Sequence, residues 1–247
     1  MKMIEYGERS KEIMIFLHGG GLSWWNYKEI AENLEREYHV LMPILDGHAG
    51  SDREFISIEE NAREIIEYID SKCNGSVLLI GGLSLGAQIL LEILAQRRDI
   101  CKYAIIESAL IIPQRIINGY VKPSVYMSYG LIKKRWFARL QFHALRMKQE
   151  MFESYYEDTC QISRKSLVAI LKANTSYQTK ESVKECGAKV LILVGKKESN
   201  MMIASAKKIH KLLPESALEI VENCYHGEIS MKQVKDYVRR VNVVLKK

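Results

Sequence analysis

Short apolar segments alternate with amphipathic segments of helical length along most of this chain. The candidate strands are near-continuous runs of β-branched and aliphatic residues, as expected where both faces of a parallel sheet are covered. They are Ile13–Leu17, Val40–Ile44, Val77–Gly81, Tyr103–Ile106, Val190–Val194 and Leu218–Val221. Helical patterns follow them over Trp25–Tyr38, Ile58–Ile69, Leu85–Gln96, Ile203–Leu213 and Ile229–Leu245. This order predicts an α/β fold with a doubly wound, mostly parallel sheet.

Residues 111–186 interrupt the alternation, because they contain no convincing strand. Apolar residues recur at steps of three or four from Trp136 to Tyr155, and Ser163 is a candidate N-cap for a further helix. A helical insertion that follows a sheet strand is expected to lie over the edge of the sheet. The sequence therefore predicts a core formed by residues 1–110 and 187–247, with residues 111–186 as a helical cap.

Composition excludes several classes of protein. The five cysteines are an odd number without a CxxC pair, which indicates free thiols in the cytoplasm and no zinc site. The apolar runs are too short to span a bilayer, so we expect no stable membrane insertion. The net charge of +6 comes with no nucleic-acid-binding motif, and we expect no nucleic-acid partner. The sequence leaves the oligomeric state open.

The segment Gly82-Leu83-Ser84-Leu85-Gly86 carries the clearest chemical signal. It matches G-x-S-x-G, with an apolar strand before it and an apolar helix after it, which is the setting that a nucleophile elbow requires. The serine of such an elbow sits on a strained turn with its hydroxyl beyond the carboxyl edge of the sheet. Ser84 is therefore the predicted nucleophile.

A glycine-rich segment, His18-Gly19-Gly20-Gly21, directly follows the first candidate strand. Its backbone can direct an N–H group at a reacting carbonyl oxygen, and the N–H of Leu85 would supply the second donor of an oxyanion hole. Gly20 is the preferred donor and Gly21 the alternative, while His18 is expected to brace the loop.

A serine nucleophile needs a base, and a histidine base needs an acid that fixes its tautomer. Of the six histidines, His226 has the most suitable position, on a loop after the last strand and before the final helix. Glu198 follows the strand Val190–Val194 and is the preferred acid. Glu107, which follows Tyr103–Ile106, is the alternative.

Together these segments resemble the α/β-hydrolase superfamily, in its small esterase-like and lipase-like members. The resemblance rests on the glycine loop, on Asp46-Gly47-His48-Ala49-Gly50-Ser51, on the elbow, on Gly195-x-x-Glu198 and on Tyr225-His226-Gly227. It implies a structural role for His48 and a cap over the active site. Glutamate at the acid position and Ala49 in the second segment depart from the usual family pattern.

We expect a serine hydrolase that cleaves carboxylic esters with an apolar acyl group and needs no metal or cofactor. Its partner is a small-molecule ester, for which the cap offers Tyr126, Met127, Trp136 and Met147 as candidate contacts. The same residues could instead cleave an amide, as in aminopeptidases, cleave a carbon–carbon bond, or catalyse a lyase reaction. A ligand sensor with slow or absent turnover is the alternative from another class.

Overall fold

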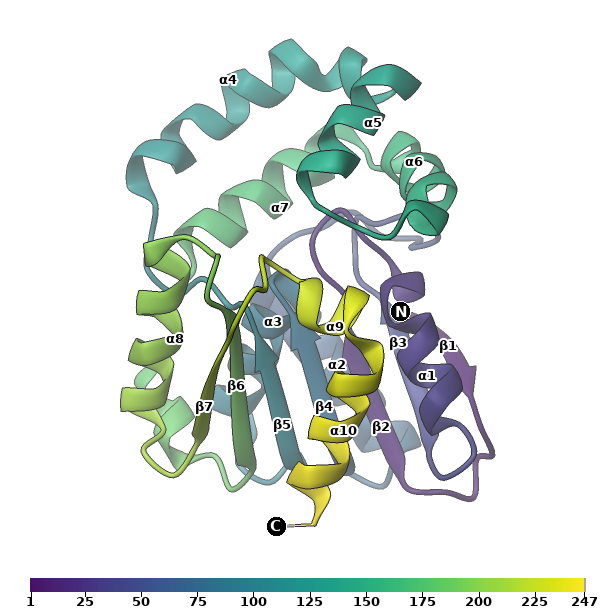
Figure 1. Cartoon of the computed structure of the whole chain (residues 1–247), viewed down its shortest axis with the longest axis vertical. Helices are drawn as coiled ribbons and strands as arrows, with labels where there is room; N and C mark the ends of the chain where they lie inside the picture. Colours follow the sequence, from purple (N-terminus) through teal and green to yellow (C-terminus); the bar gives the residue numbers. More distant parts are fainter. Residues whose placement is uncertain (247) are drawn as a thin grey trace.

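A seven-stranded sheet forms the centre of the molecule, in the order β1-β3-β2-β4-β5-β6-β7 (Figure 1). The computed structural model describes residues 1–246. The strands are β1 (Lys2–Tyr6), β2 (Ile13–Leu17), β3 (His39–Ile44), β4 (Val77–Leu83), β5 (Cys101–Glu107), β6 (Lys189–Gly195) and β7 (Ala217–Val221). Only the edge strand β1 is antiparallel to its neighbour, and all other adjacent pairs within these residues are parallel. The predicted fold class is confirmed.

All six predicted strands are present, and most extend one to three residues beyond the predicted limits. The strand β1 was not predicted from the sequence; it is short, lies at the edge of the sheet and has only exposed and half-buried residues. Such a strand lacks the continuous apolar run that identifies strands covered on both faces.

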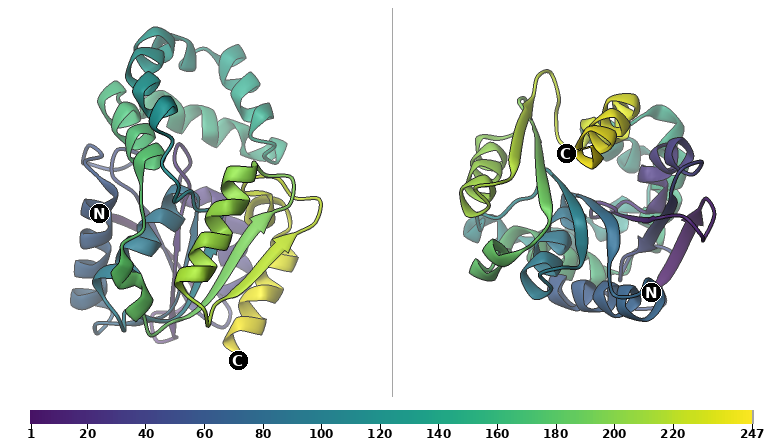
Figure 2. Two further views of the ribbon diagram at one scale, coloured as in Figure 1. Left: turned by 90° about the vertical axis from the view of Figure 1, so that its left-hand side faces the viewer. Right: turned by 90° about the horizontal axis from the view of Figure 1, so that it is seen from below.

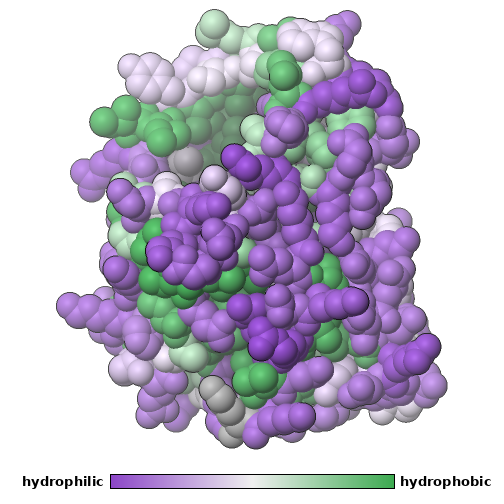
Figure 3. All heavy atoms as spheres, in the orientation of Figure 1, coloured by the Kyte–Doolittle hydropathy of each residue, from purple (hydrophilic) through white to green (hydrophobic). Residues whose placement is uncertain are grey.

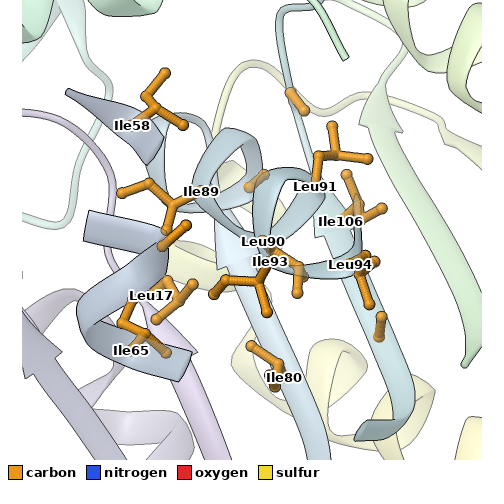
Figure 4. Close-up of a cluster of buried hydrophobic side chains, with 14 of the residues drawn as sticks. Leu17, Ile58, Ile65, Ile80, Ile89, Leu90, Leu91, Ile93, Leu94 and Ile106 are labelled. Atoms are coloured by element: carbon orange, nitrogen blue, oxygen red, sulfur yellow. The ribbon is translucent and has the colours of Figure 1, made fainter. Parts of the chain in front are cut away.

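Helices cover both faces of the sheet and bury two apolar clusters (Figure 2). One face carries α2 (Ile58–Lys72), α3 (Leu85–Gln96) and α8 (Asn200–Leu212). The other carries α1 (Lys28–Leu34), α9 (Glu228–Lys232) and α10 (Val234–Leu245), together with a 3₁₀ turn at Trp24–Tyr27. Figure 4 shows α3 over the strands with α2 beside it, and Ile89, Leu90 and Ile93 in the cluster. The helix that follows Ser84 is thus held on all sides.

Between β5 and β6 the chain is helical. Its four α-helices are α4 (Arg115–Ile132), α5 (Arg135–Ala144), α6 (Phe152–Gln161) and α7 (Arg164–Ser176), with 3₁₀ turns at Gln149–Met151 and Glu181–Glu185. They lie beyond the ends of the strands, and α7 lies between α4 and the core (Figure 1). We call α4–α7 the cap. The single periodic pattern predicted from Trp136 to Tyr155 is divided between α5 and α6, since Arg146 takes a left-handed conformation with φ of 53°.

The two ends of the cap meet in a short neck. The N–H of Gln114 donates to the carbonyl of Thr175 at 2.7 Å, and the Asn118 amide donates to the carbonyl of Lys172 at 2.8 Å. After Thr175 the chain runs back along the core, where Tyr177 and Val183 are buried beside α3. The last ten residues of the predicted insertion, 177–186, therefore pack on the core rather than in the cap. Within residues 1–246, no helix combines the length and apolar character needed to cross a bilayer.

Candidate active site

Ser84 occupies the sharp turn between β4 and α3. Its backbone has φ of 53° and ψ of −110°, a strained conformation for a residue with a side chain. The flanking glycines make this turn possible, because a Cβ on Gly86 would overlap the carbonyl of Leu17 and one on Gly82 would lie 2.5 Å from the carbonyl oxygen of Gly86. Ser84 is partly exposed, and among residues 1–246 its hydroxyl has no hydrogen-bond partner. The local geometry is that of a nucleophile elbow.

His226 and Glu198 come from neighbouring loops and are in direct contact. His226 Nδ1 lies 2.8 Å from Glu198 Oε2. The other carboxylate oxygen, Oε1, accepts hydrogen bonds from the Gly195 N–H and from the Ser108 hydroxyl, each at 2.7 Å. The Glu198 side chain is only 1% exposed, whereas that of His226 is 41% exposed. A buried carboxylate thus holds the Nδ1 edge of an imidazole whose Nε2 remains free to exchange a proton.

The loop of His226 lies against the elbow. Gly227 has a left-handed backbone with φ of 71°, and a Cβ at this position would lie 3.4 Å from both δ-carbons of Leu83, the residue before Ser84. No hydrogen bond joins the Ser84 hydroxyl to His226 in the part of the chain that the structure describes. The structure therefore brings His226 and Glu198 together and packs the His226 loop on the residue next to Ser84.

The two candidate oxyanion donors are neighbours. A Cβ built on Gly20 would lie 3.6 Å from the Cβ of Leu85. The N–H of Gly21 is already bound, since it donates to His48 Nε2 at 3.0 Å. The N–H of Gly20 has no acceptor among residues 1–246, and that of Leu85 belongs to the first turn of α3, where no intrahelical acceptor exists. Gly20 and Leu85 thus retain unused donors beside Ser84.

His18 and His48 support the loops around these donors. His18 Nε2 accepts the N–H of Leu45 at 3.1 Å. Burial lowers the pKa of His18 and lowers that of His48 to about 4, so both rings are neutral near pH 7. A neutral ring is what His48 needs to accept a hydrogen bond from Gly21.

Glu107, the alternative acid, does not bind His226. Its side chain is fully buried, and Oε1 accepts the N–H of Ser230 in α9 at 3.2 Å. Burial raises the pKa of Glu107 to about 7, although the hydrogen bond from Ser230 acts in the opposite direction. Its backbone also supports the elbow, since the carbonyl of Glu107 accepts the N–H of Ser84 at 2.9 Å.

Ser108 is the residue that sequence reasoning missed. It is buried, has a positive φ of 55°, and its hydroxyl holds Glu198. Its position directly after β5 could have marked it as a candidate, because side chains there reach the carboxyl edge of the sheet. Glu107 and Ser108 together touch the backbone of Ser84, the helix after His226, and the carboxylate of Glu198.

The candidate substrate contacts in the cap are dispersed. Tyr126, Met127 and Trp136 are more than half exposed, and Met147 is buried where the cap meets the core. Ile170 of α7 comes close to the glycine loop, since its Cγ2 would lie 3.4 Å from a Cβ on Gly20. A role of the four predicted residues in substrate binding stays a prediction. No group of three or more His, Cys, Asp or Glu side chains in residues 1–246 is arranged to hold a metal ion.

Sequence comparison identifies the family. The profile of the family described as serine aminopeptidase, S33, matches residues 8–230, nearly the whole chain. The chain belongs to this family. It is therefore an α/β hydrolase, as the elbow and the sheet indicated. No protein with a curated description matches the S33-family chain in sequence.

Solved structures share the fold at low sequence identity. An esterase from Exiguobacterium antarcticum is 16% identical with a TM-score of 0.83, and the match covers 99% of this chain and 95% of the esterase. A thermophilic esterase from Thermogutta terrifontis is 15% identical with a TM-score of 0.78, over 99% and 92% of the two chains. The enol-lactonase from Burkholderia xenovorans is 12% identical with a TM-score of 0.77, over 100% and 96%. At such identities these similarities establish the fold of the S33-family hydrolase and not its substrate.

Proposed function

We propose that this α/β hydrolase cleaves carboxylic esters with an apolar acyl group, using Ser84 as nucleophile, His226 as base and Glu198 as acid. The observation that carries the proposal is the 2.8 Å contact of His226 Nδ1 with the buried Glu198 carboxylate, on a loop packed against the strained turn of Ser84. A buried carboxylate fixes the tautomer of the imidazole and stabilises the imidazolium that forms during proton transfer.

The reaction proceeds in two halves. His226 Nε2 takes the proton of the Ser84 hydroxyl while Oγ attacks the ester carbonyl, and the N–H groups of Gly20 and Leu85 stabilise the oxyanion. The imidazolium then protonates the leaving alcohol, and the acyl group remains on Ser84. A water molecule, deprotonated by His226, attacks the acyl-enzyme. Collapse of the second oxyanion breaks the bond to Ser84 and releases the acid, while the imidazolium returns its proton to the Ser84 Oγ.

Two observations favour an ester with an apolar acyl group over a peptide substrate that carries a free amino group. Ile170 places an aliphatic side chain above Gly20. Of the four cap carboxylates that could bind a substrate amine, two are already engaged, since Asp158 accepts the indole N–H of Trp25 at 2.7 Å and Glu153 is paired with Arg135. The family description nevertheless makes cleavage of an amide the second candidate. All five cysteines are free thiols, which supports a reducing compartment such as the cytoplasm.

The decisive experiment uses a fluorophosphonate label and a panel of p-nitrophenyl esters. We expect the label to be found on Ser84 and the esters to give a burst of p-nitrophenol as the acyl-enzyme accumulates. Ser84→Ala should abolish both, whereas Ser71→Ala, at an exposed serine of α2, should change neither. Tight binding of esters without turnover in the unmodified protein would support a ligand sensor. Faster cleavage of aminoacyl anilides than of esters would support the aminopeptidase.

A pair of isosteric variants tests the acid. Glu198→Gln should lower kcat about 10⁴-fold, as loss of the acid does in a Ser-His-Asp triad. Glu107→Gln should retain most of the activity, because Glu107 does not contact His226. The reverse result would assign the acid to Glu107 and refute the proposed triad.

A further inference from the structure

Exposed apolar side chains are concentrated on two helices of the cap. Of the fourteen large hydrophobic side chains exposed in residues 1–246, nine lie between positions 116 and 145. Met127 is 85% exposed, Ile116 80% and Leu140 61%. Figure 3 shows apolar atoms at the surface of the cap over α4. Soluble proteins seldom leave so many large apolar side chains together in water, and such patches mark sites of interaction.

Each of the two helices has a second apolar face that the fold leaves uncovered. In α4, Val121, Val125 and Ile132 are buried on the side that meets α7. Helical spacing places Ile116, Tyr120, Met127 and Leu131 together on another side, turned away from this buried one.

The same arrangement recurs in α5. Ala138 and Phe142 are buried, and Phe142 packs on Phe152 of α6. Trp136 and Leu140 lie one turn apart on the opposite side and are exposed. The two exposed faces are therefore not required for packing of the cap.

This region of the chain is strongly basic. Residues 108–149 contain eight lysines and arginines and no aspartate or glutamate, although the chain as a whole has 30 acidic residues. Arg115, Lys122, Lys133, Lys134 and Arg139 are all exposed, and none of these five forms an ion pair among residues 1–246. A second copy of the chain would bring like charges together on this face, which opposes self-association. A partner that complements this basic and apolar face has an anionic surface with an apolar layer beneath it.

We propose that α4 and α5 dock on the surface of an anionic lipid bilayer. The exposed apolar side chains of both helices would enter the interfacial zone, where tryptophan and tyrosine side chains are favoured. The lysines and arginines around them would contact the headgroups. Docking is peripheral, since no described helix can span a bilayer. This inference does not depend on the proposed esterase activity.

Vesicle binding of the full-length protein tests the proposal. Vesicles of phosphatidylcholine alone are compared with vesicles in which about one third of the lipid is phosphatidylglycerol, by flotation and by tryptophan fluorescence. We expect binding to the anionic vesicles, weaker binding to the neutral ones, and a loss of affinity in high salt. Trp136 is the most exposed tryptophan, so its emission should shift to shorter wavelength on binding. The shift should be absent in Trp136→Phe.

Matched variants separate docking from general charge and hydrophobicity. The double variant Lys133→Gln/Lys134→Gln should weaken binding about thirtyfold. Its control, Lys207→Gln/Lys208→Gln in α8, removes the same charge from another surface and should have little effect. Ile116→Gln should also weaken binding, whereas Val243→Gln, at an exposed apolar position of α10, should not.

Three results would overturn the proposal. They are no binding to anionic vesicles in low salt, equal binding to neutral and anionic vesicles, and equal losses in the cap variants and their controls. Light scattering provides an independent check, because a dimer that Ile116→Gln dissociates would assign this face to a second copy of the chain. Since all substituted side chains are exposed, unchanged thermal melting is expected for each variant.

Discussion

The hydroxyl of Ser108 donates a 2.7 Å hydrogen bond to Glu198, on the oxygen that does not face His226. The two residues are 90 positions apart and meet because β5 and β6 are neighbours in the sheet. Together with the N–H of Gly195, this hydroxyl determines the direction in which the carboxylate points. Ser108 is thus a positioning residue for the proposed acid.

Removing the Ser108 hydroxyl should lower the turnover rate. We expect Ser108→Ala to reduce kcat about tenfold with little change in KM, because Glu198 would lose one of its orienting donors while the substrate contacts stay intact. Steady-state kinetics on the best ester measures this. Ser108→Gly is the matched variant, since it also removes the hydroxyl but relieves the positive φ of 55°. Normal kcat in both variants would exclude a positioning role.

The buried carboxyl of Glu107 should make stability depend on pH. The folded protein keeps this group protonated up to about pH 7, whereas in the unfolded chain it ionises near pH 4.5. The folded state therefore holds the extra proton between these values, and stability falls as the pH rises from 4.5 to 7.

Glu107→Gln removes the titrating group but keeps an oxygen that can accept the N–H of Ser230. Relative to the unmodified protein, we expect the variant to gain up to about 3 kcal/mol of stability between pH 4.5 and pH 8. Urea denaturation of both proteins across this range gives the difference. Parallel stability curves would show that Glu107 ionises normally in the folded protein.

His48 should support the oxyanion loop through its bond to Gly21. His48→Leu leaves the N–H of Gly21 without its acceptor, which should cost about 1–3 kcal/mol in stability. It should also lower kcat, because Gly20, the proposed oxyanion donor, directly precedes Gly21 in the loop. Denaturation and ester kinetics are measured together. His210→Leu, at a partly exposed histidine of α8, should alter stability only slightly and leave kcat unchanged, and an equal kcat loss there would contradict the assignment.

Two helical glycines should respond to alanine in opposite ways. Gly86→Ala places a methyl group against the carbonyl of Leu17 and should destabilise the protein by about 3 kcal/mol. At Gly119 of α4 a Cβ would lie in open space, so Gly119→Ala should stabilise the protein by about 0.5–1 kcal/mol. Thermal melting measures both. If Gly86→Ala melts like the unmodified protein, α3 does not pack as closely on β2 as described.

Much of the core was predictable because its strands are covered on both faces. Apolar runs identified the mostly buried strands β2 to β6, the aliphatic residues of β7 identified that strand although it is largely exposed, and the glycines around Ser84 identified the turn between β4 and α3. The edge strand β1 escaped detection because it has no fully buried residue and no continuous apolar run. The break between α5 and α6 also escaped, since it depends on the left-handed backbone of Arg146, a residue type that usually continues a helix.

From the sequence, the site residues could be predicted only from their positions after successive strands of the sheet. Loops that follow parallel strands share one edge, and this principle selected Ser84, Glu198 and His226. It could not decide between Glu198 and Glu107, because that choice depends on which carboxylate reaches the imidazole and which turns toward Ser230. Ser108 was missed for the same reason, since its partner is known only once the order of the strands is known.

The neck at Gln114 and Thr175 makes the cap a module that leaves the core and returns to it at one place. Its helices can therefore be exchanged for those of another hydrolase by joining two adjacent points of the chain, without cutting any strand of the sheet. If the cap binds substrate and membrane as we propose, such chimaeras would keep the catalytic machinery of one protein and take their substrate and membrane preference from the other.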